Sequence, residues 1–167
     1  MIDEEVVYAS PYLVVRRVRK AMPSGEIGVF DIRDEADVAV CLPVAADGSL
    51  VLVEEFRHGS GRSLFEIPGG CVDPHEDIAA AAAREVLEES GFSGEVVHLA
   101  STWISAYSTA RKHIFIMPAA RRISQPAPEP SELSRVVQVS LDDFRTVLAD
   151  GALTDLDAGL LCLRRLT

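Results

Sequence analysis

The chain has 167 residues, of which 48% are hydrophobic and 25% charged, and its formal net charge at pH 7 is −10. This size and composition are typical of one soluble globular domain over residues 1–167, and they exclude a membrane-spanning segment because no apolar run is long enough. The acidic balance argues against long-range attraction to nucleic acid, and three widely spaced cysteines argue against a disulfide framework and favour a reducing cytoplasm.

The first part of the chain is predicted to form β-strands. Segments with alternating or β-branched apolar residues are 6–20, 29–32, 37–44, 50–56 and 63–67. The run at 37–44 is mostly apolar, which predicts a buried strand. Ala46-Asp47-Gly48 predicts a hairpin turn between this strand and its partner at 50–56.

A helix is predicted over about residues 77–90. Asp77 or Glu76 can serve its N-terminus, where negative charge is favoured, and Gly91 suits the left-handed residue beyond its end. This helix carries carboxylates on one side. The opposite face, which we expect to pack on the sheet, carries Ala79, Ala83, Val86 and Leu87.

The remaining chain is predicted to alternate strands with loops and to end in helices. Further strands are expected at 95–103, 113–118 and 135–139, a proline-rich surface loop at 121–134, and helices at 141–149 and 155–165. Strands on both sides of one helix, with helices at the end, predict an α/β sandwich around a mixed sheet.

The carboxylates of the first helix indicate chemistry. Glu85, Glu88 and Glu89 are spaced i, i+3, i+4, so they fall within an arc of roughly 100°. Such a cluster is usually a solvated face, but three like charges this close also suit a bound cation, and hard oxygen ligands favour Mg²⁺ or Mn²⁺. The glycine-bearing loop that precedes the helix, with Arg84 and Gly91, favours the metal site and an enzyme acting on phosphates.

Residues 70–92 resemble the Nudix hydrolase box, G-x5-E-x7-R-E-U-x-E-E-x-G-U, at every defined position. The flanks Val53–Arg57 and Phe65–Gly70 resemble the branch of ADP-ribose pyrophosphatases and nucleoside-diphosphate-sugar hydrolases. The resemblance implies a Nudix-type α/β/α sandwich. It also implies hydrolysis of the diphosphate bond of a nucleoside diphosphate linked to another moiety, with Mg²⁺ as cofactor and Mn²⁺ as the alternative. For ADP-ribose the products would be AMP and ribose 5-phosphate.

The resemblance also implies site residues. Metal ligands would be the Gly69 carbonyl, Glu85, Glu88 and Glu89, with Glu85 and Glu89 central to catalysis. Arg57 would contact a phosphate or ribose, since its planar fork suits phosphate oxygens, and Glu66 would lie just outside the metal ligands. Arg84 is expected to form a salt bridge with Glu76 or with a helix carboxylate, which would orient the ligands.

The general base stays open between several glutamates. In the resembling branch it lies on a late loop, which here offers Glu132 and Glu129, and a box glutamate is the alternative. Glu132 stands in the more similar context, just ahead of the strand at 135–139. We therefore predict that Glu132 is the preferred candidate for the general base.

Substrate identity is open as well. Many ADP-ribose pyrophosphatases carry a Ser-Pro-Gly-type loop after the box, whereas Ser105–Thr109 lacks the proline and the glycine. Tyr107 of this loop could stack on a base or pack internally. One alternative function is hydrolysis of a damaged nucleoside triphosphate, a dinucleoside polyphosphate or a coenzyme. Another is that the protein is a non-catalytic nucleotide sensor. The branch also implies a homodimer to which the N-terminal segment, about residues 1–36, contributes.

Overall fold

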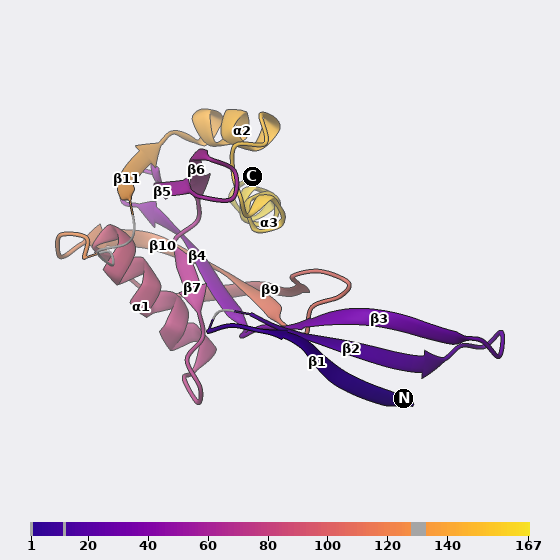
Figure 1. Ribbon diagram of the computed structural model, residues 1–167. Helices are drawn as coiled ribbons and strands as arrows, with labels where there is room; N and C mark the ends of the chain where they lie inside the picture. The colour runs from indigo at the N-terminus through magenta and orange to yellow at the C-terminus, as the bar shows by residue number, and fades with distance from the viewer. Residues whose placement is uncertain (1, 12, 128–132) are drawn as a thin grey trace. The chain divides into compact units, whose positions relative to one another are not determined.

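A computed structural model of the chain describes residues 2–11, 13–127 and 133–167, shown in Figure 1. The described residues divide into two compact units. The first unit comprises Met1–Asp37 and Thr102–Lys112, and the second comprises Val38–Ser101 and His113–Thr167. That the two units together form the single domain expected over residues 1–167 stays a prediction.

The first unit contains an antiparallel sheet in the order β1-β2-β3. These strands are β1 (Asp3–Ala9), β2 (Val14–Ala21) and β3 (Ile27–Asp34). The strands predicted within 6–20 and at 29–32 are thus present, with β1 beginning earlier than expected and β3 extending beyond both ends of 29–32. Every residue of β1 is exposed, including Val6 at 60% and Tyr8 at 54%, so this sheet presents apolar side chains on its surface.

The loop at residues 104–110 belongs to the first unit, and its backbone bonds to β3. Arg33 N–H donates to the Tyr107 carbonyl at 2.8 Å, and Thr109 N–H donates to the Arg33 carbonyl at 2.9 Å. Tyr107 stacks on Phe30 with ring centroids 6.4 Å apart. Of the two roles expected for Tyr107, the structure shows packing against a neighbouring ring, although 54% of the residue is exposed.

The second unit is built on a sheet whose main path runs β11-β5-β4-β10-β8, with β6 on β5, β7 on β4 and β9 on β10. Its strands are β4 (Val38–Ala45), β5 (Leu50–Arg57), β6 (Arg62–Glu66), β7 (Gly69–Cys71), β8 (Phe92–Ser93), β9 (Val97–Trp103), β10 (Arg111–Arg122) and β11 (Ser134–Val139). The predicted hairpin is present, since Ala45 N–H donates to the Ser49 carbonyl at 2.8 Å. The surface loop expected at 121–134 begins only after Arg122, because the end of β10 pairs with β8.

The central strand β4 buries both of its faces. Ala39 and Cys41 pack in a core with α1 (Ile78–Ser90), whereas Val40 and Leu42 pack in a second core with α2 (Leu141–Ala149) and α3 (Leu156–Leu166). Figure 1 shows α1 on one side of β4 and β5 and the other two helices on the opposite side. Burial on both faces explains the nearly continuous apolar run. The expected α/β/α sandwich is confirmed.

Helix α1 has the ends that the sequence predicts. The Asp77 side chain accepts hydrogen bonds from Ala79 N–H and Ala80 N–H, both at 3.0 Å. Gly91 ends the helix in the left-handed conformation with φ 75°. Both contacts satisfy backbone groups that a helix end leaves unpaired.

The packing face of α1 differs in part from the expected one. Its fully buried residues are Ala81, Ala82, Val86 and Ser90. Val86 was expected there, and the half-buried Ala79 packs against the same core, whereas Ala83 and Leu87 are only half-buried. The reason is that Ala81, Glu85 and Glu89 form one i, i+4, i+8 row, so two of the glutamates emerge beside the packing face rather than opposite it. In the described part of the chain, no helix is long and apolar enough to cross a membrane.

Candidate active site

Strand β7 brings glycine backbone against two carboxylates of α1. Gly69 N–H donates to Glu89 Oε2 at 3.1 Å. A Cβ at Gly70 would lie 2.5 Å from Glu85 Oε1, so the Glu85 carboxylate occupies the space that a side chain would need. A Cβ at Gly69 would lie 2.5 Å from the Ala39 carbonyl oxygen, because β7 is paired closely with β4. The two glycines therefore let Glu85 and Glu89 lie beside the strand.

Arg84 binds carboxylates from the loop and from its own helix. Its Nε and Nη2 donate to Glu76 at 2.9 and 3.0 Å, and its Nη1 donates to Glu85 at 2.8 Å and to Glu88 at 3.3 Å. The expected salt bridge to Glu76 is present. Hydrogen bonds from Arg84, with one from the Asp73 backbone, lower the pKa of Glu76 to about 2. Arg84 thus fixes the glycine-bearing loop against α1.

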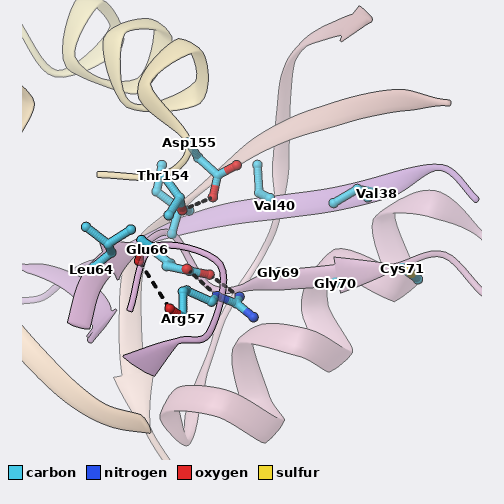
Figure 2. Close-up of a pocket in the computed structure, with 12 residues that line it drawn as sticks. Val38, Val40, Arg57, Leu64, Glu66, Gly69, Gly70, Cys71, Thr154 and Asp155 are labelled. Carbon is cyan, nitrogen blue, oxygen red and sulfur yellow. Dashed lines mark hydrogen bonds and ion pairs between the residues drawn. The ribbon is translucent and has the colours of Figure 1, made fainter. Parts of the chain in front are cut away.

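Arg57, the last residue of β5, lies between two further carboxylates, those of Glu55 and Glu66, and Figure 2 shows its contact with Glu66. Its Nε donates to Glu66 at 2.6 Å, its Nη2 pairs with the other Glu66 oxygen, and its Nη1 lies 3.1 Å from Glu55. The hydrogen bonds to Glu66 raise the pKa of Arg57 most, and the charges of Glu55 and Glu89 raise it further. The influence of Glu89 links this set with the carboxylates of α1.

These carboxylates differ in exposure. The side chains of Glu55, Glu66 and Glu85 are 11%, 12% and 14% exposed, whereas that of Glu88 is 52% exposed. Screening by water weakens charge interactions at exposed positions, so Glu85 is better suited than Glu88 to hold a cation tightly. The three glutamates of the sequence cluster are therefore not equivalent.

The donor set fits a hard divalent cation that keeps part of its water. Among the described residues, no group of three or more His, Cys, Asp or Glu side chains is placed so that it could hold a metal ion by itself. A structural zinc site would need four such ligands. Mg²⁺ is commonly bound through one or two carboxylates and retains several waters, which Glu85, Glu89 and the Gly69 carbonyl suit. The residues present thus fit Mg²⁺ or Mn²⁺.

A cavity of about 460 Å³ lies beside these groups (Figure 2). Its wall combines the Arg57–Glu66 pair and the backbone of Gly69 and Gly70 with aliphatic and polar side chains from other elements. Those side chains are Val38, Val40, Ser60, Leu64, Ile67, Cys71, Thr154 and Asp155. This size is in the range of small-molecule sites. Arg57 thus faces a space that can hold part of a substrate.

The base candidates Glu129 and Glu132 lie outside the described residues. The chain on either side of them is attached to the site. Ala127 N–H donates to the Glu88 carbonyl at 2.7 Å, and Phe56 N–H donates to the Leu133 carbonyl at 3.1 Å. Sequence reasoning did not single out Glu55, Thr154 or Asp155, and no spacing in the sequence relates the last two to the box.

Comparison with known proteins identifies the class. The NUDIX domain family model matches residues 34–158, so the chain belongs to the Nudix family, and the resemblance seen in residues 70–92 is confirmed. Proteins of this family generally use divalent metal ions and act on small nucleoside diphosphate derivatives.

Two curated relatives are similar to the chain over part of their length. The chain is 32% identical over 109 residues to putative nudix hydrolase 2 of Caenorhabditis elegans, covering 58% of this chain and 49% of that protein. It is 25% identical over 140 residues to the ADP-ribose pyrophosphatase of Mycobacterium tuberculosis, covering 78% of this chain and 65% of that protein. The chain therefore spans about half the length of the first relative and less than two thirds of the second.

A crystal structure of an ADP compounds hydrolase matches with a TM-score of 0.84 at 22% identity, over 99% of this chain and 92% of that one. At this identity the match concerns the fold, and it agrees with the α/β/α sandwich described above.

Proposed function

We propose that the protein is a metal-dependent pyrophosphohydrolase that cleaves the diphosphate bond of ADP-ribose or a nucleotide sugar. With ADP-ribose, water adds across the bridge and the products are AMP and ribose 5-phosphate. The observation that carries this proposal is the position of Glu85 and Glu89 against the glycines of β7, beside a cavity that Arg57 lines. The similarity to the Mycobacterium tuberculosis ADP-ribose pyrophosphatase supports the substrate class.

Each group of the site has a part in this reaction. Glu85, Glu88, Glu89 and the Gly69 carbonyl would hold Mg²⁺, with Mn²⁺ as the alternative. When bound, such an ion supplies neutralisation of phosphate charge and activation of a water molecule. Arg57 would bind a phosphate oxygen through its planar fork, exchanging part of its contact with Glu66 for the substrate.

Arg84 and Glu76 would act through the carboxylates that they position. Because Arg84 donates to Glu76, Glu85 and Glu88, it fixes the loop and the helix in one arrangement. We propose that Glu132 is the general base that accepts the proton released by the attacking water, with Glu129 or a box glutamate as alternatives. The resemblance to the ADP-ribose pyrophosphatase branch supports a base in this part of the chain.

We further propose a homodimer formed through the N-terminal sheet. The exposed apolar residues of β1, among them Val6 and Tyr8, support this proposal because a surface of that kind is usually covered. Light scattering on the purified protein tests it, since a monomeric mass at micromolar concentration would contradict it. The cytoplasmic location expected from the free cysteines stays a prediction.

A substrate panel tests the activity. Wild type and Glu89→Gln would be compared with Mg²⁺ on ADP-ribose, ADP-glucose, a nucleoside triphosphate, a dinucleoside polyphosphate and a dinucleotide coenzyme. We expect AMP and ribose 5-phosphate from the first. The hydrolytic activity of Glu89→Gln should fall by more than the roughly 10–100-fold that follows loss of a residue that only orients a metal ligand. Binding of ADP-ribose without any product would overturn the proposal in favour of a sensor.

A further inference from the structure

The cavity beside Arg57 has a polar corner that comes from outside the Nudix box and its flanks. Thr154 and Asp155 form this corner, just ahead of α3. In Figure 2, Thr154 and Asp155 are drawn above Arg57 and Glu66, and Val40 is drawn beside them. The position of Thr154 and Asp155 in the wall of the same cavity suggests a contact with the substrate.

Backbone contacts fix this corner to β6. Phe65 N–H donates to the Ala152 carbonyl at 2.9 Å, and Thr154 N–H donates to the Phe65 carbonyl at 3.0 Å. Between them Leu153 is buried, with only 4% of its surface exposed. A segment held by two hydrogen bonds and one core side chain keeps Thr154 and Asp155 in place, so a ligand would meet a preformed wall.

The chemistry of this corner selects hydrogen-bond donors. An ionised carboxylate only accepts hydrogen bonds, and Thr154 Oγ1 already donates one to Asp155 Oδ2 at 3.4 Å. The Asp155 side chain does not cap the described helix α3. It is half-buried, so a bond that it forms with a ligand is less screened than one at the open surface.

The rest of the wall favours a sugar over a base. Val38, Val40, Leu64 and Ile67 are aliphatic, and none of the described lining side chains is aromatic. Bases are usually held by stacking on aromatic side chains, whereas the hydroxyls of a sugar donate hydrogen bonds to a carboxylate such as that of Asp155. An acidic residue on ribose hydroxyls is an established solution in dinucleotide sites.

We propose that Asp155, assisted by Thr154, binds the hydroxyls of the sugar on the non-nucleoside side of the diphosphate. This inference rests on the proposed function, because it assigns one half of that substrate to the cavity. Arg57 lines the same cavity and would take the phosphate to which the sugar is attached. Asp155 is then a residue that determines specificity, and the groups that cleave the bond do not depend on it.

Calorimetric binding of ribose 5-phosphate and of propyl phosphate tests this assignment. Propyl phosphate carries the same phosphate and lacks the hydroxyls. Wild type should prefer ribose 5-phosphate, and Asp155→Asn and Asp155→Ala should weaken its binding by about 10–100-fold while changing that of propyl phosphate by less than about 2-fold. Asp157→Asn, on the exposed side of the same helix, is the matched control and should bind both as wild type does.

Equal binding of both phosphates by wild type, or an equal loss of both in Asp155→Asn, would overturn the assignment. Thr154→Val gives a second test if the Asp155 variants do not fold, since it removes a hydroxyl at constant volume and should weaken only ribose 5-phosphate. In turnover, Asp155→Asn should lower kcat/KM for ADP-ribose and leave that for the propyl ester of ADP unchanged.

The two proposals can fail separately. Asp155-dependent binding of ribose 5-phosphate by a protein that hydrolyses no diphosphate would refute the proposed activity and support the sugar contact. Hydrolysis of ADP-ribose by a protein whose binding and turnover do not change in Asp155→Asn would support the proposed activity and refute the sugar contact.

Discussion

Substitution of Gly70 by alanine would separate the effect on the proposed metal site from the effect on the stability of the fold. The added Cβ would lie 2.5 Å from Glu85 Oε1 and 2.7 Å from Glu85 Cδ, and these are the closest atoms that it meets. Both belong to the far end of a flexible side chain, which can move. The φ of Gly70 is not in the left-handed region, so alanine can adopt the same backbone. Only the Glu85 carboxylate must shift.

The size of the shift sets the expected effect. Ordinary contact begins at 3.4 Å, so the oxygen must move by about 0.9 Å. A displacement of about 1 Å in a catalytic group can cost roughly 100-fold in rate. Stability should be unchanged or higher by about 0.4–1 kcal/mol, because alanine lowers the entropy of the unfolded chain. The variant should therefore be folded and about 100-fold slower.

Steady-state hydrolysis of ADP-ribose with Mg²⁺ and urea unfolding would be measured on the same preparations. Gly59→Ala is the matched control, since its Cβ meets nothing within 4 Å, and both properties should stay at wild-type values. Gly69→Ala should instead lower stability, because its Cβ meets the Ala39 carbonyl and Val40 Cα of the paired strand. A Gly70→Ala variant with turnover within 3-fold of wild type, roughly 0.6 kcal/mol, would refute the reasoning.

Three further outcomes are expected. Gly159→Ala places a Cβ 2.5 Å from Leu148 Cδ2 and 2.6 Å from Leu153 Cδ2, and this overpacking should cost about 1–3 kcal/mol in urea unfolding; an unchanged midpoint would contradict the packing of α3. Glu76→Gln should be less stable than wild type above pH 4.5, and the difference should disappear as the pH falls toward 2, because Arg84 lowers the pKa of Glu76 from 4.5 to about 2. A difference that persists unchanged at pH 2 would exclude this ion pair as its source. Glu132→Gln should lower kcat by orders of magnitude with metal binding retained, whereas Glu129→Gln should not; near wild-type turnover of the first would remove Glu132 from the mechanism.

Local signals made α1 and its surroundings predictable. The cap at Asp77, the left-handed Gly91 and the turn after Ala45 each depend on a few neighbouring residues, so the sequence shows them directly. The Arg84–Glu76 pair was also predictable, because a loop carboxylate and a helix guanidinium flank the same short segment.

Long-range packing made the rest unpredictable. The rotation of α1 that buries Ala81 depends on how the helix sits against β4 and β7. The contact of Arg57 with Glu66 depends on the register of β5 and β6. Asp155 reaches the cavity only because the chain preceding α3 pairs with Phe65, some ninety positions earlier, and composition or periodicity carries no trace of such a pairing.

Phe65 and Glu66 are adjacent in β6, and each holds one end of the cavity. The Phe65 backbone bonds the segment before α3, and the Glu66 carboxylate bonds Arg57. A single peptide unit therefore sets the separation between the groups that would meet the phosphate and those that would meet the sugar. Exchanging the side chain at position 155 can then retune the preferred ligand during evolution while the length of the accepted ligand stays constant.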